Sequence, residues 1–132
     1  MLTGKLFTIN TIDLLQLNKE NAYFSKYSVT LALNCHHDIF NGHFPGNPVL
    51  PGVCQVEMIR ELAEKILGLR LLLSQASHVK FLSLINPLIS PVLCLNLTLG
   101  ESGRNEFDVS AEVTSVESVC MKMKGQFKEF KT

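Results

Sequence analysis

The chain has 132 residues, of which 46% are hydrophobic and only 18% are charged. A chain of this length is expected to form a single domain, here residues 1–132, with its own core. Lysine plus arginine and aspartate plus glutamate number 12 each, so there is no net positive charge to favour a nucleic-acid partner. The low charged fraction indicates that much of the surface is covered by a second subunit or by an apolar ligand.

The sequence also argues against insertion in or export across a membrane. It contains no run of about 18 apolar residues, so we expect no membrane span. The first residues lack the basic start and apolar stretch of a signal peptide, and the four cysteines show no Cys-x-x-Cys spacing. We therefore expect a cytoplasmic protein whose cysteines are reduced and mostly buried.

Two strand-like segments open the chain. Residues 5–13 are rich in β-forming residues, and a second such run at 22–34 follows a polar turn at 18–21. These runs predict an antiparallel pair of strands.

A single helix is predicted next. From Val53 the apolar residues recur every three to four positions, while Pro51 and Gly52 are placed to open the helix and Gly68 to close it. The apolar positions of this helix are Val53, Val56, Ile59, Leu62, Ala63, Ile66 and Leu67.

The rest of the chain alternates like β-structure. We expect a strand that ends at 78–81 and further strands at 92–100, 107–116 and 119–130, with a hairpin turn at 102–105. One helix with about six antiparallel strands is an α+β domain.

The most constrained stretch is residues 41–57, which place three glycines and three prolines in their first twelve positions. Such a loop holds its side chains in place, and it presents His43 shortly before the predicted helix. Histidine has an ordinary pKa of about 6.5, which suits a general base at neutral pH. Glu57 follows one turn into the helix and offers a carboxyl group that could act as the acid.

Gly52 and Val53 lie at the predicted helix start, where the first backbone N–H groups have no intrahelical partners. These donors and the positive end of the helix dipole suit a carbonyl oxygen on which negative charge develops. Glycine at 52 also lets a substrate approach the backbone closely. Base, acid and oxyanion donor together suit removal of a proton α to a carbonyl, followed by loss of a hydroxyl group.

Residues 42–53 read GHFPGNPVLPGV, and Glu57 follows them. This stretch resembles the signature of the 3-hydroxyacyl-(acyl-carrier-protein) dehydratases of hot-dog fold. The resemblance implies a long central helix wrapped by a curved antiparallel sheet. It implies that His43 is the catalytic base, that Glu57 is the acid and that the Gly52 amide binds the thioester carbonyl, with Val53 and Phe44 also contacting the substrate.

The same resemblance implies a homodimer or a higher oligomer in which each site takes its histidine from one chain and its acid from the other. Glutamate at 57 resembles the branch of the family that only dehydrates, because the branch that also isomerises the double bond has aspartate there. Two positions depart from the family pattern. Leu88-Ile89 replace a usual Gly-Asp after the Lys80–Pro87 motif, and Glu61 stands where many members have glutamine. Two carboxylates one helical turn apart are expected to raise each other's pKa.

The expected reaction converts a 3-hydroxyacyl thioester on acyl carrier protein to the trans-2-enoyl thioester, in fatty-acid or polyketide/polyene-type chain synthesis. It needs no metal or redox cofactor, because water elimination transfers no electrons, and the phosphopantetheine arm of the carrier holds the substrate. Two alternatives remain open: a hot-dog acyl thioesterase, and a non-catalytic acyl-binding or assembly subunit.

Several charged residues allow more than one interpretation. Glu57 could instead belong to a solvated helix face with Arg60, Glu61 and Glu64. Because acyl carrier proteins are acidic, the partner also requires a basic patch near the site. The candidates for this patch are Arg60, Lys65, Arg70, Lys80, Arg104, Lys122 and Lys124.

Overall fold

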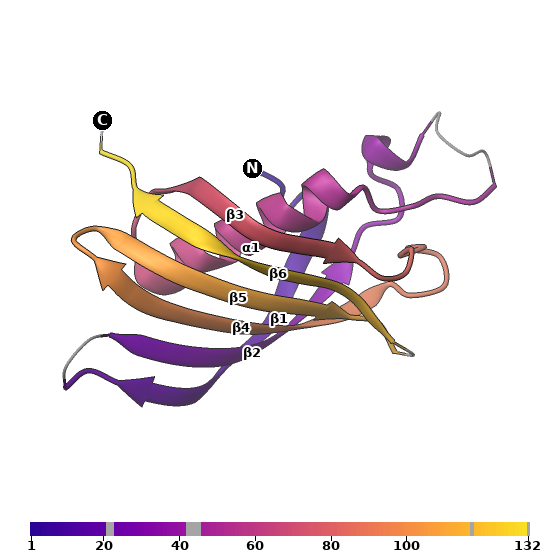
Figure 1. Ribbon diagram of the computed structural model, residues 1–132. Coiled ribbons are helices and arrows are strands. Elements are labelled where there is room, and N and C mark those ends of the chain that lie inside the picture. The colour runs from indigo at the N-terminus through magenta and orange to yellow at the C-terminus, as the bar shows by residue number, and fades with distance from the viewer. Residues whose placement is uncertain (21–22, 42–45, 117, 132) are drawn as a thin grey trace.

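The computed structural model describes residues 1–20, 23–41, 46–116 and 118–131. Within these ranges one long helix, α1 (Gly52–Leu67), lies along one face of a six-stranded antiparallel sheet (Figure 1). The strands are β1 (Phe7–Asn18), β2 (Phe24–Leu33), β3 (Leu71–Phe81), β4 (Val92–Gly103), β5 (Glu106–Thr114) and β6 (Val119–Glu129), in the spatial order β1-β2-β4-β5-β6-β3. This arrangement confirms the α+β class and the six strands, while the wrapping of the helix by the sheet stays a prediction.

The first strand is longer than the sequence pattern predicts. β1 continues five residues beyond the predicted 5–13, because Leu14 pairs with Tyr27 and Asn18 pairs with Phe24 of β2. Register shifts after Ile9 and Leu14 break the alternation of side chains, which hides this part of the strand in the sequence. Residues 21 and 22, where the turn was expected to end and the second strand to begin, lie outside the described residues.

Local signals at both ends define α1 as predicted. The carbonyl of Pro51 accepts hydrogen bonds from the N–H groups of Cys54 and Gln55, at 3.1 and 3.2 Å. The helix ends before Gly68, whose φ of 69° is the left-handed conformation that favours glycine at this position. The Gly68 N–H donates to the carbonyl of Glu64 at 2.8 Å and so completes the last turn.

The core lies between α1 and the face of the sheet that it covers. Alternate side chains of β4, Leu93, Leu95, Leu97 and Leu99, are fully buried and belong to one cluster with the buried residues of α1. Burying each such leucine contributes about 1.5–3 kcal/mol relative to leaving it exposed. The buried face of α1 contains Met58, Ile59, Leu62 and Ala63, whereas Val53, predicted to belong to it, is 76% exposed.

A glycine in β6 accommodates an irregular part of β3. The pairing of β3 with β6 shifts between Leu73 and Gln75 and again between Ala76 and His78. A Cβ atom on Gly125 would collide with the carbonyl oxygen of Gln75, so the bulged backbone approaches β6 as closely as only glycine allows. The bulges therefore determine which side chains of the last part of β3 lie on the outer face of the sheet.

Glu61 fastens the N-terminal segment to the helix. Its carboxylate accepts hydrogen bonds from the Leu2 N–H at 2.9 Å, the Thr3 N–H at 2.9 Å and the Thr3 hydroxyl at 2.6 Å, and the residue is only 3% exposed. Burial alone would raise the pKa of Glu61, but these hydrogen bonds lower it overall. The expectation that a neighbouring carboxylate raises the pKa of Glu61 is therefore wrong.

Replacing Glu61 with glutamine should lower the free energy of unfolding at pH 7 by about 2 kcal/mol, because hydrogen bonds to a charged acceptor contribute roughly 1.5–3 kcal/mol. The folded-state pKa lies below the unfolded value, so this stabilisation is complete above the ordinary glutamate pKa of about 4.3 and is lost as the pH falls below it. Urea unfolding at pH 7 and at pH 3 should show the difference between the two proteins shrink. The exposed Glu101→Gln is the control, and equal stability of Glu61→Gln and wild type at pH 7 would contradict this account.

Candidate active site

The start of α1 lies against the end of β3. A Cβ atom built on Gly52 would lie 2.5 Å from Cζ of the Phe81 ring, so this contact requires glycine or a displaced ring. Phe81 is 54% exposed and Val53 is 76% exposed, so the two side chains beside Gly52 are open to a ligand or a partner. The Gly52 amide lies at the first position of α1, ahead of the N–H groups of Cys54 and Gln55 that donate to the Pro51 carbonyl.

The loop that leads into the helix is anchored just before Gly52. Leu50 is 1% exposed, and its N–H donates to the carbonyl of Ile85 at 2.8 Å. His43 and Phe44 lie outside the described residues, so their placement and roles stay predictions. The described part of the loop shows that the chain after them enters α1 in a fixed position.

Glu57 forms a two-point ion pair with Arg60. The Arg60 Nε donates to Oε1 at 2.7 Å and Nη2 donates to Oε2 at 2.6 Å. The remaining Nη1 lies 2.7 Å from Oε2 of Glu64 and donates to the carbonyl of Leu71 at 3.0 Å. Hydrogen bonding to Glu57 is the main reason that the pKa of Arg60 is raised, and the charge of Glu64 adds to it. Arg60 therefore fixes the orientation of the Glu57 carboxylate and ties it to the start of β3.

This network argues against the alternative interpretation, a solvated helix face formed by Glu57, Arg60, Glu61 and Glu64. Glu61 is buried against the N-terminal segment, and the Glu57 side chain is 35% exposed within its pair with Arg60. The sequence spacing permits the pair of Glu57 and Arg60, but sequence reasoning did not assign Arg60 to Glu57. Whether Glu57 acts as the acid stays a prediction.

Two further side chains of the first turn are buried next to the site. Gln55 is 4% exposed, its Nε2 donates to the carbonyl of Leu50 at 3.4 Å, and its Oε1 has no hydrogen-bond partner among the described residues. Sequence reasoning did not single out Gln55. Burial raises the pKa of the Cys54 thiol, and the charge of Glu57 adds to the shift, so Cys54 is a poor nucleophile that fits the predicted packing role.

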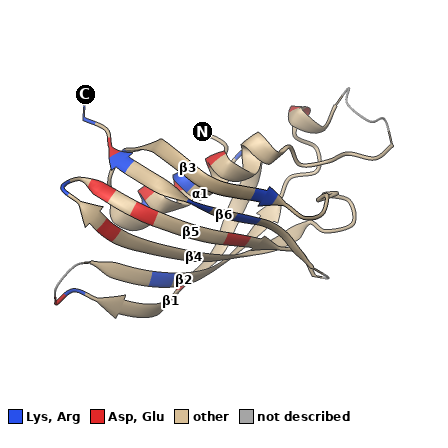
Figure 2. Ribbon diagram, in the orientation of Figure 1, with Lys and Arg blue, Asp and Glu red and all other residues tan. Residues whose placement is uncertain are grey.

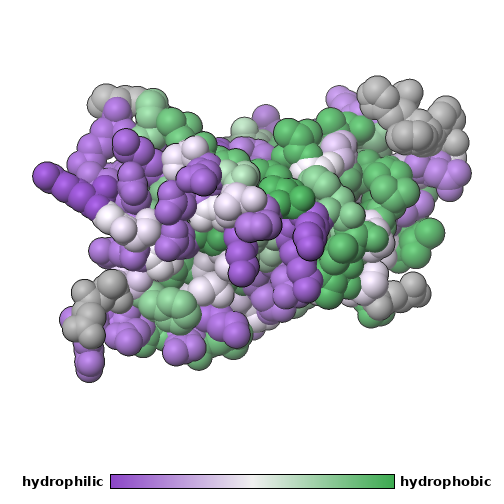
Figure 3. All heavy atoms as spheres, in the orientation of Figure 1, coloured by the Kyte–Doolittle hydropathy of each residue, from purple (hydrophilic) through white to green (hydrophobic). Residues whose placement is uncertain are grey.

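Exposed apolar side chains lie at the start of α1, at the end of β3 and in the segment that follows β3, and we call this group the apolar rim. Its members are Val53, Phe81, Leu82, Leu84, Leu88 and Ile89. Figure 3 shows hydrophobic residues concentrated at this end of the molecule. Leu88 and Ile89, which depart from the family pattern, lie in a turn in which the Leu88 N–H donates to Oδ1 of Asn86 at 2.9 Å. The departure therefore adds apolar surface next to the site.

A sheet of this strand order with one helix on one face is the hot-dog fold, and solved structures share it. An uncharacterised protein from Erwinia carotovora subsp. atroseptica superposes with a TM-score of 0.62 at 23% identity, covering 93% of this chain and 94% of that chain. The dehydratase heterocomplex ApeI:P from Xenorhabdus doucetiae gives 0.58 at 20%, covering 91% and 100%. A putative thioesterase, yhdA from Lactococcus lactis, gives 0.65 at 13%, covering 93% and 94%. At these identities the likeness shows the fold alone.

Sequence comparison is more specific. The family model ApeI-like, described as ApeI dehydratase, matches residues 17–122, and the chain therefore belongs to the ApeI-like dehydratase family. The 3-hydroxyacyl-[acyl-carrier-protein] dehydratase FabZ of Lactobacillus helveticus is 30% identical over 112 residues, which are 80% of this chain and 72% of that protein. The enzyme of the same name from Lactiplantibacillus plantarum is 32% identical over 91 residues, 64% of this chain and 60% of that protein. These findings confirm the resemblance to hot-dog dehydratases.

Variants of the ion-pair network should separate a site role of Glu57 from a purely structural one. Glu57→Gln cannot donate a carboxyl proton and should lower dehydration turnover by roughly 10²- to 10⁴-fold. Arg60→Gln keeps Glu57 but frees its carboxylate, so we expect a smaller loss of about ten- to a hundredfold from misplacement. Glu64→Gln is the matched control, because it leaves the pair of Glu57 and Arg60 intact. Steady-state kinetics and thermal unfolding measure these effects, and wild-type turnover in a folded Glu57→Gln would remove Glu57 from the mechanism.

Proposed function

We propose that the protein eliminates water from a 3-hydroxyacyl thioester carried on acyl carrier protein and yields the trans-2-enoyl thioester. The observation that carries this proposal is the match to the ApeI-like dehydratases over residues 17–122, which includes the whole stretch 41–57. The curated relatives support the same substrate class, since they are named as 3-hydroxyacyl-[acyl-carrier-protein] dehydratases. The C2–H and C3–O bonds break, a double bond forms between C2 and C3, and water leaves.

In the proposed mechanism His43 removes the proton from C2. The Gly52 amide, in the first turn of α1, donates a hydrogen bond to the thioester oxygen as negative charge develops there. Glu57 protonates the departing hydroxyl, and Val53 and Phe44 contact the substrate. His43 gains one proton and Glu57 loses one, so a proton transfer between them, directly or through solvent, restores the starting state.

The ion pair adds a requirement to this mechanism. Both oxygens of Glu57 accept from Arg60, so Arg60 must release at least one of them before Glu57 can carry a proton to the hydroxyl. Arg60 keeps its contacts with Glu64 and with the Leu71 carbonyl when this happens. The guanidinium therefore remains paired, and release of Glu57 does not leave a partly buried charge without a partner.

We also infer that the active unit is a homodimer or a higher oligomer with shared sites. The apolar rim includes Val53, Leu84 and Ile89, which are 76%, 81% and 74% exposed. An exposed apolar patch of this kind is typical of a protein–protein interface. β3 forms one edge of the sheet, where a second copy can add its own edge strand. A composite site, with His43 and Glu57 from different chains, follows from the family resemblance.

No redox or metal cofactor is required for this reaction, and no helix in the described ranges is long and apolar enough to cross a membrane. A cytoplasmic location fits the four cysteines, which are free thiols.

A thioesterase would have to activate water at the carbonyl carbon. The thioesterase-named structure shares only the fold, whereas the sequence relatives are dehydratases.

The reaction is tested by incubating the protein with a 3-hydroxyacyl carrier and following the mass of the acyl group. We expect the loss of one water, whereas a free acid would indicate the thioesterase and no change the non-catalytic alternative. His43→Ala should lower turnover by roughly 10²- to 10⁴-fold with the fold retained. His36→Ala, at an exposed histidine, is the control. Normal turnover in a folded His43→Ala would exclude His43 as the base.

Mixing two inactive variants tests whether the sites are shared. In a heterodimer of His43→Ala and Glu57→Ala chains, one composite site carries both substitutions and the other has an intact His43 and Glu57. Random mixing makes about half of all dimers heterodimers, so activity should recover to about a quarter of wild type. The two chains are refolded together, heterodimers are confirmed by native mass spectrometry, and dehydration is assayed. Heterodimers without activity would show that His43 and Glu57 meet within one chain.

A further inference from the structure

Four basic side chains face one another across two strands of the outer face of the sheet, opposite α1. β3 and β6 pair in a register that sets His78 against Lys124 and Lys80 against Lys122, and all four residues are exposed. We call these four residues the basic ladder. Lys80 and Lys122 place like charges directly opposite each other, an arrangement that destabilises a sheet.

The ladder has little negative charge beside it. In the next strand Glu112 is in register with Lys122, and Ser110 is in register with Lys124. The ion pairs found among the described residues are those of Arg60, and the lysines of the ladder form none there. The ladder, Ser110 and Glu112 line a hollow of about 440 Å³. The ladder is therefore a recessed positive surface on a chain without net charge.

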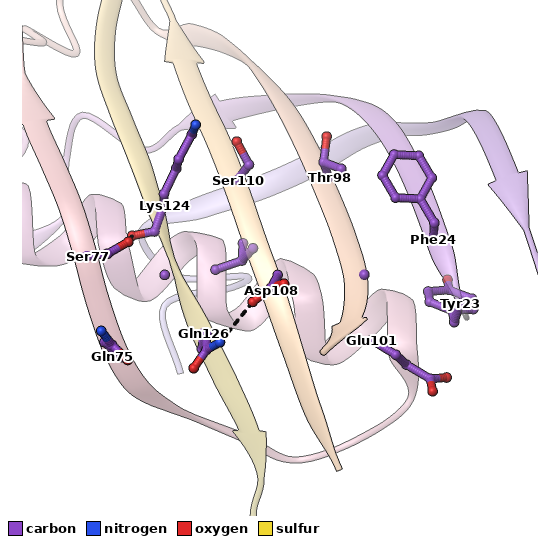
Figure 4. A pocket seen from close by; sticks show the side chains of 13 residues that line it. Tyr23, Phe24, Gln75, Ser77, Thr98, Glu101, Asp108, Ser110, Lys124 and Gln126 are labelled. Carbon is purple, nitrogen blue, oxygen red and sulfur yellow. Dashed lines mark hydrogen bonds between the residues drawn. The ribbon is translucent and has the colours of Figure 1, made fainter. Parts of the chain in front are cut away.

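The hollow of the ladder continues into a second hollow on the outer face. A second hollow, of about 660 Å³, shares Ser110 and Lys124 with the first and extends toward Glu101 and Asp108 (Figure 4). In it Asp108 accepts a hydrogen bond from the Gln126 amide at 3.0 Å. Figure 2 shows acidic positions on β4 and β5 and basic positions on β3 and β6. An anionic partner is therefore attracted more strongly to the hollow of the ladder, whose one carboxylate is Glu112, than to the second hollow, which contains Glu101 and Asp108.

The basic ladder lies next to the candidate active site. Lys80 directly precedes Phe81, whose ring lies against Gly52. Because side chains alternate along a strand, Lys80 lies on the outer face while Phe81 lies on the face of α1. His78 is three residues before Phe81, which is about 10 Å along the strand. A partner bound on the ladder would therefore be held next to the entrance of the site without covering it.

The structure also reduces the number of basic residues that could form the basic patch expected from the sequence. Arg60 is engaged with Glu57 and Glu64 inside the protein. Arg70 precedes β3, at the end away from Phe81, and lies 5.8 Å from the centre of the Phe130 ring. Lys65 is in the last turn of α1, and Arg104 is in the turn between β4 and β5. Lys80, Lys122 and Lys124 remain, and His78 joins them.

We propose that the basic ladder docks the acidic carrier protein that delivers the acyl substrate, an inference that rests on the proposed function. The carrier places its carboxylates on the ladder, and its flexible arm passes around the end of β3 to Gly52. Complementary charge raises the association rate and fixes the orientation of the partner. Glu101 and Asp108 in the second hollow disfavour the reversed orientation of the carrier.

The test compares a carrier-bound substrate with a small one. The double variant Lys122→Glu with Lys124→Glu should raise the KM for the 3-hydroxyacyl carrier by at least about tenfold and weaken its salt dependence. Its kcat/KM for the same acyl group on N-acetylcysteamine should stay unchanged, since that thioester has no protein to dock. Lys26→Glu with Lys128→Glu is the matched control, with the same charge change at exposed positions outside the ladder. Lys80→Gln with Lys122→Gln should show a smaller effect of the same kind, and it replaces the first variant if that one fails to fold.

Carrier binding, followed by fluorescence anisotropy of a labelled carrier without its acyl group, separates this proposal from the proposed function. Weaker binding in the ladder variants but not in the control supports docking even if neither substrate is dehydrated, a result that would overturn only the proposed function. Equal losses on both substrates, or unchanged carrier binding, would overturn docking at the ladder. Tighter binding of a 20-base-pair DNA duplex than of the carrier would also overturn it. So would binding only of the carrier that bears the phosphopantetheine arm, because the ladder would then hold a phosphate and not the carrier body.

Discussion

The structure depends on one constraint, the burial of one face of a single sheet by a single helix. The inner strands therefore turn alternate apolar side chains toward α1, as Leu93, Leu95, Leu97 and Leu99 of β4 do. With one helix for six strands, β1 and β3 each keep an unpaired edge, and Val53 in the first turn of α1 stays exposed. Binding groups are therefore expected where the core ends, at the start of α1 and the end of β3.

The same constraint explains why the carboxylates of Glu57 and Glu61 on α1 have different surroundings. Glu61 is on the buried side and is tolerated because Leu2 and Thr3 supply its hydrogen bonds, which replace those of water. Glu57, one turn earlier, is at the margin of the buried face, where Arg60 can reach it while still contacting the start of β3. The two carboxylates are thus one helical turn apart in sequence but differ in what each one contacts.

Features that depend on interactions between residues close in sequence could be predicted, whereas features that depend on distant residues could not. The ends of α1 depend on Pro51 and Gly68, which act within one turn of the chain, and both were predicted. The length of β1 depends on a pairing interrupted by bulges, and the partners of Glu61 are 58 and 59 residues away, so neither could be predicted locally. The motif around His43 indicated the chemistry of the site, but no local pattern shows that Arg60 engages both oxygens of Glu57.

The alternation of side chains along β3 separates apolar surface from charged surface. Under the proposed function, the entrance to the site needs apolar surface for an acyl chain and a second subunit, whereas an acidic carrier needs positive charge at the same place. Mixing the two on one surface would bury lysines in the subunit interface, at the cost of desolvating them. At the end of β3, Phe81 and Lys80 are consecutive residues on opposite faces of the sheet. Apolar contacts can therefore form on the helix side while the charges stay in water, and the bulges in β3 set which residues lie on each side.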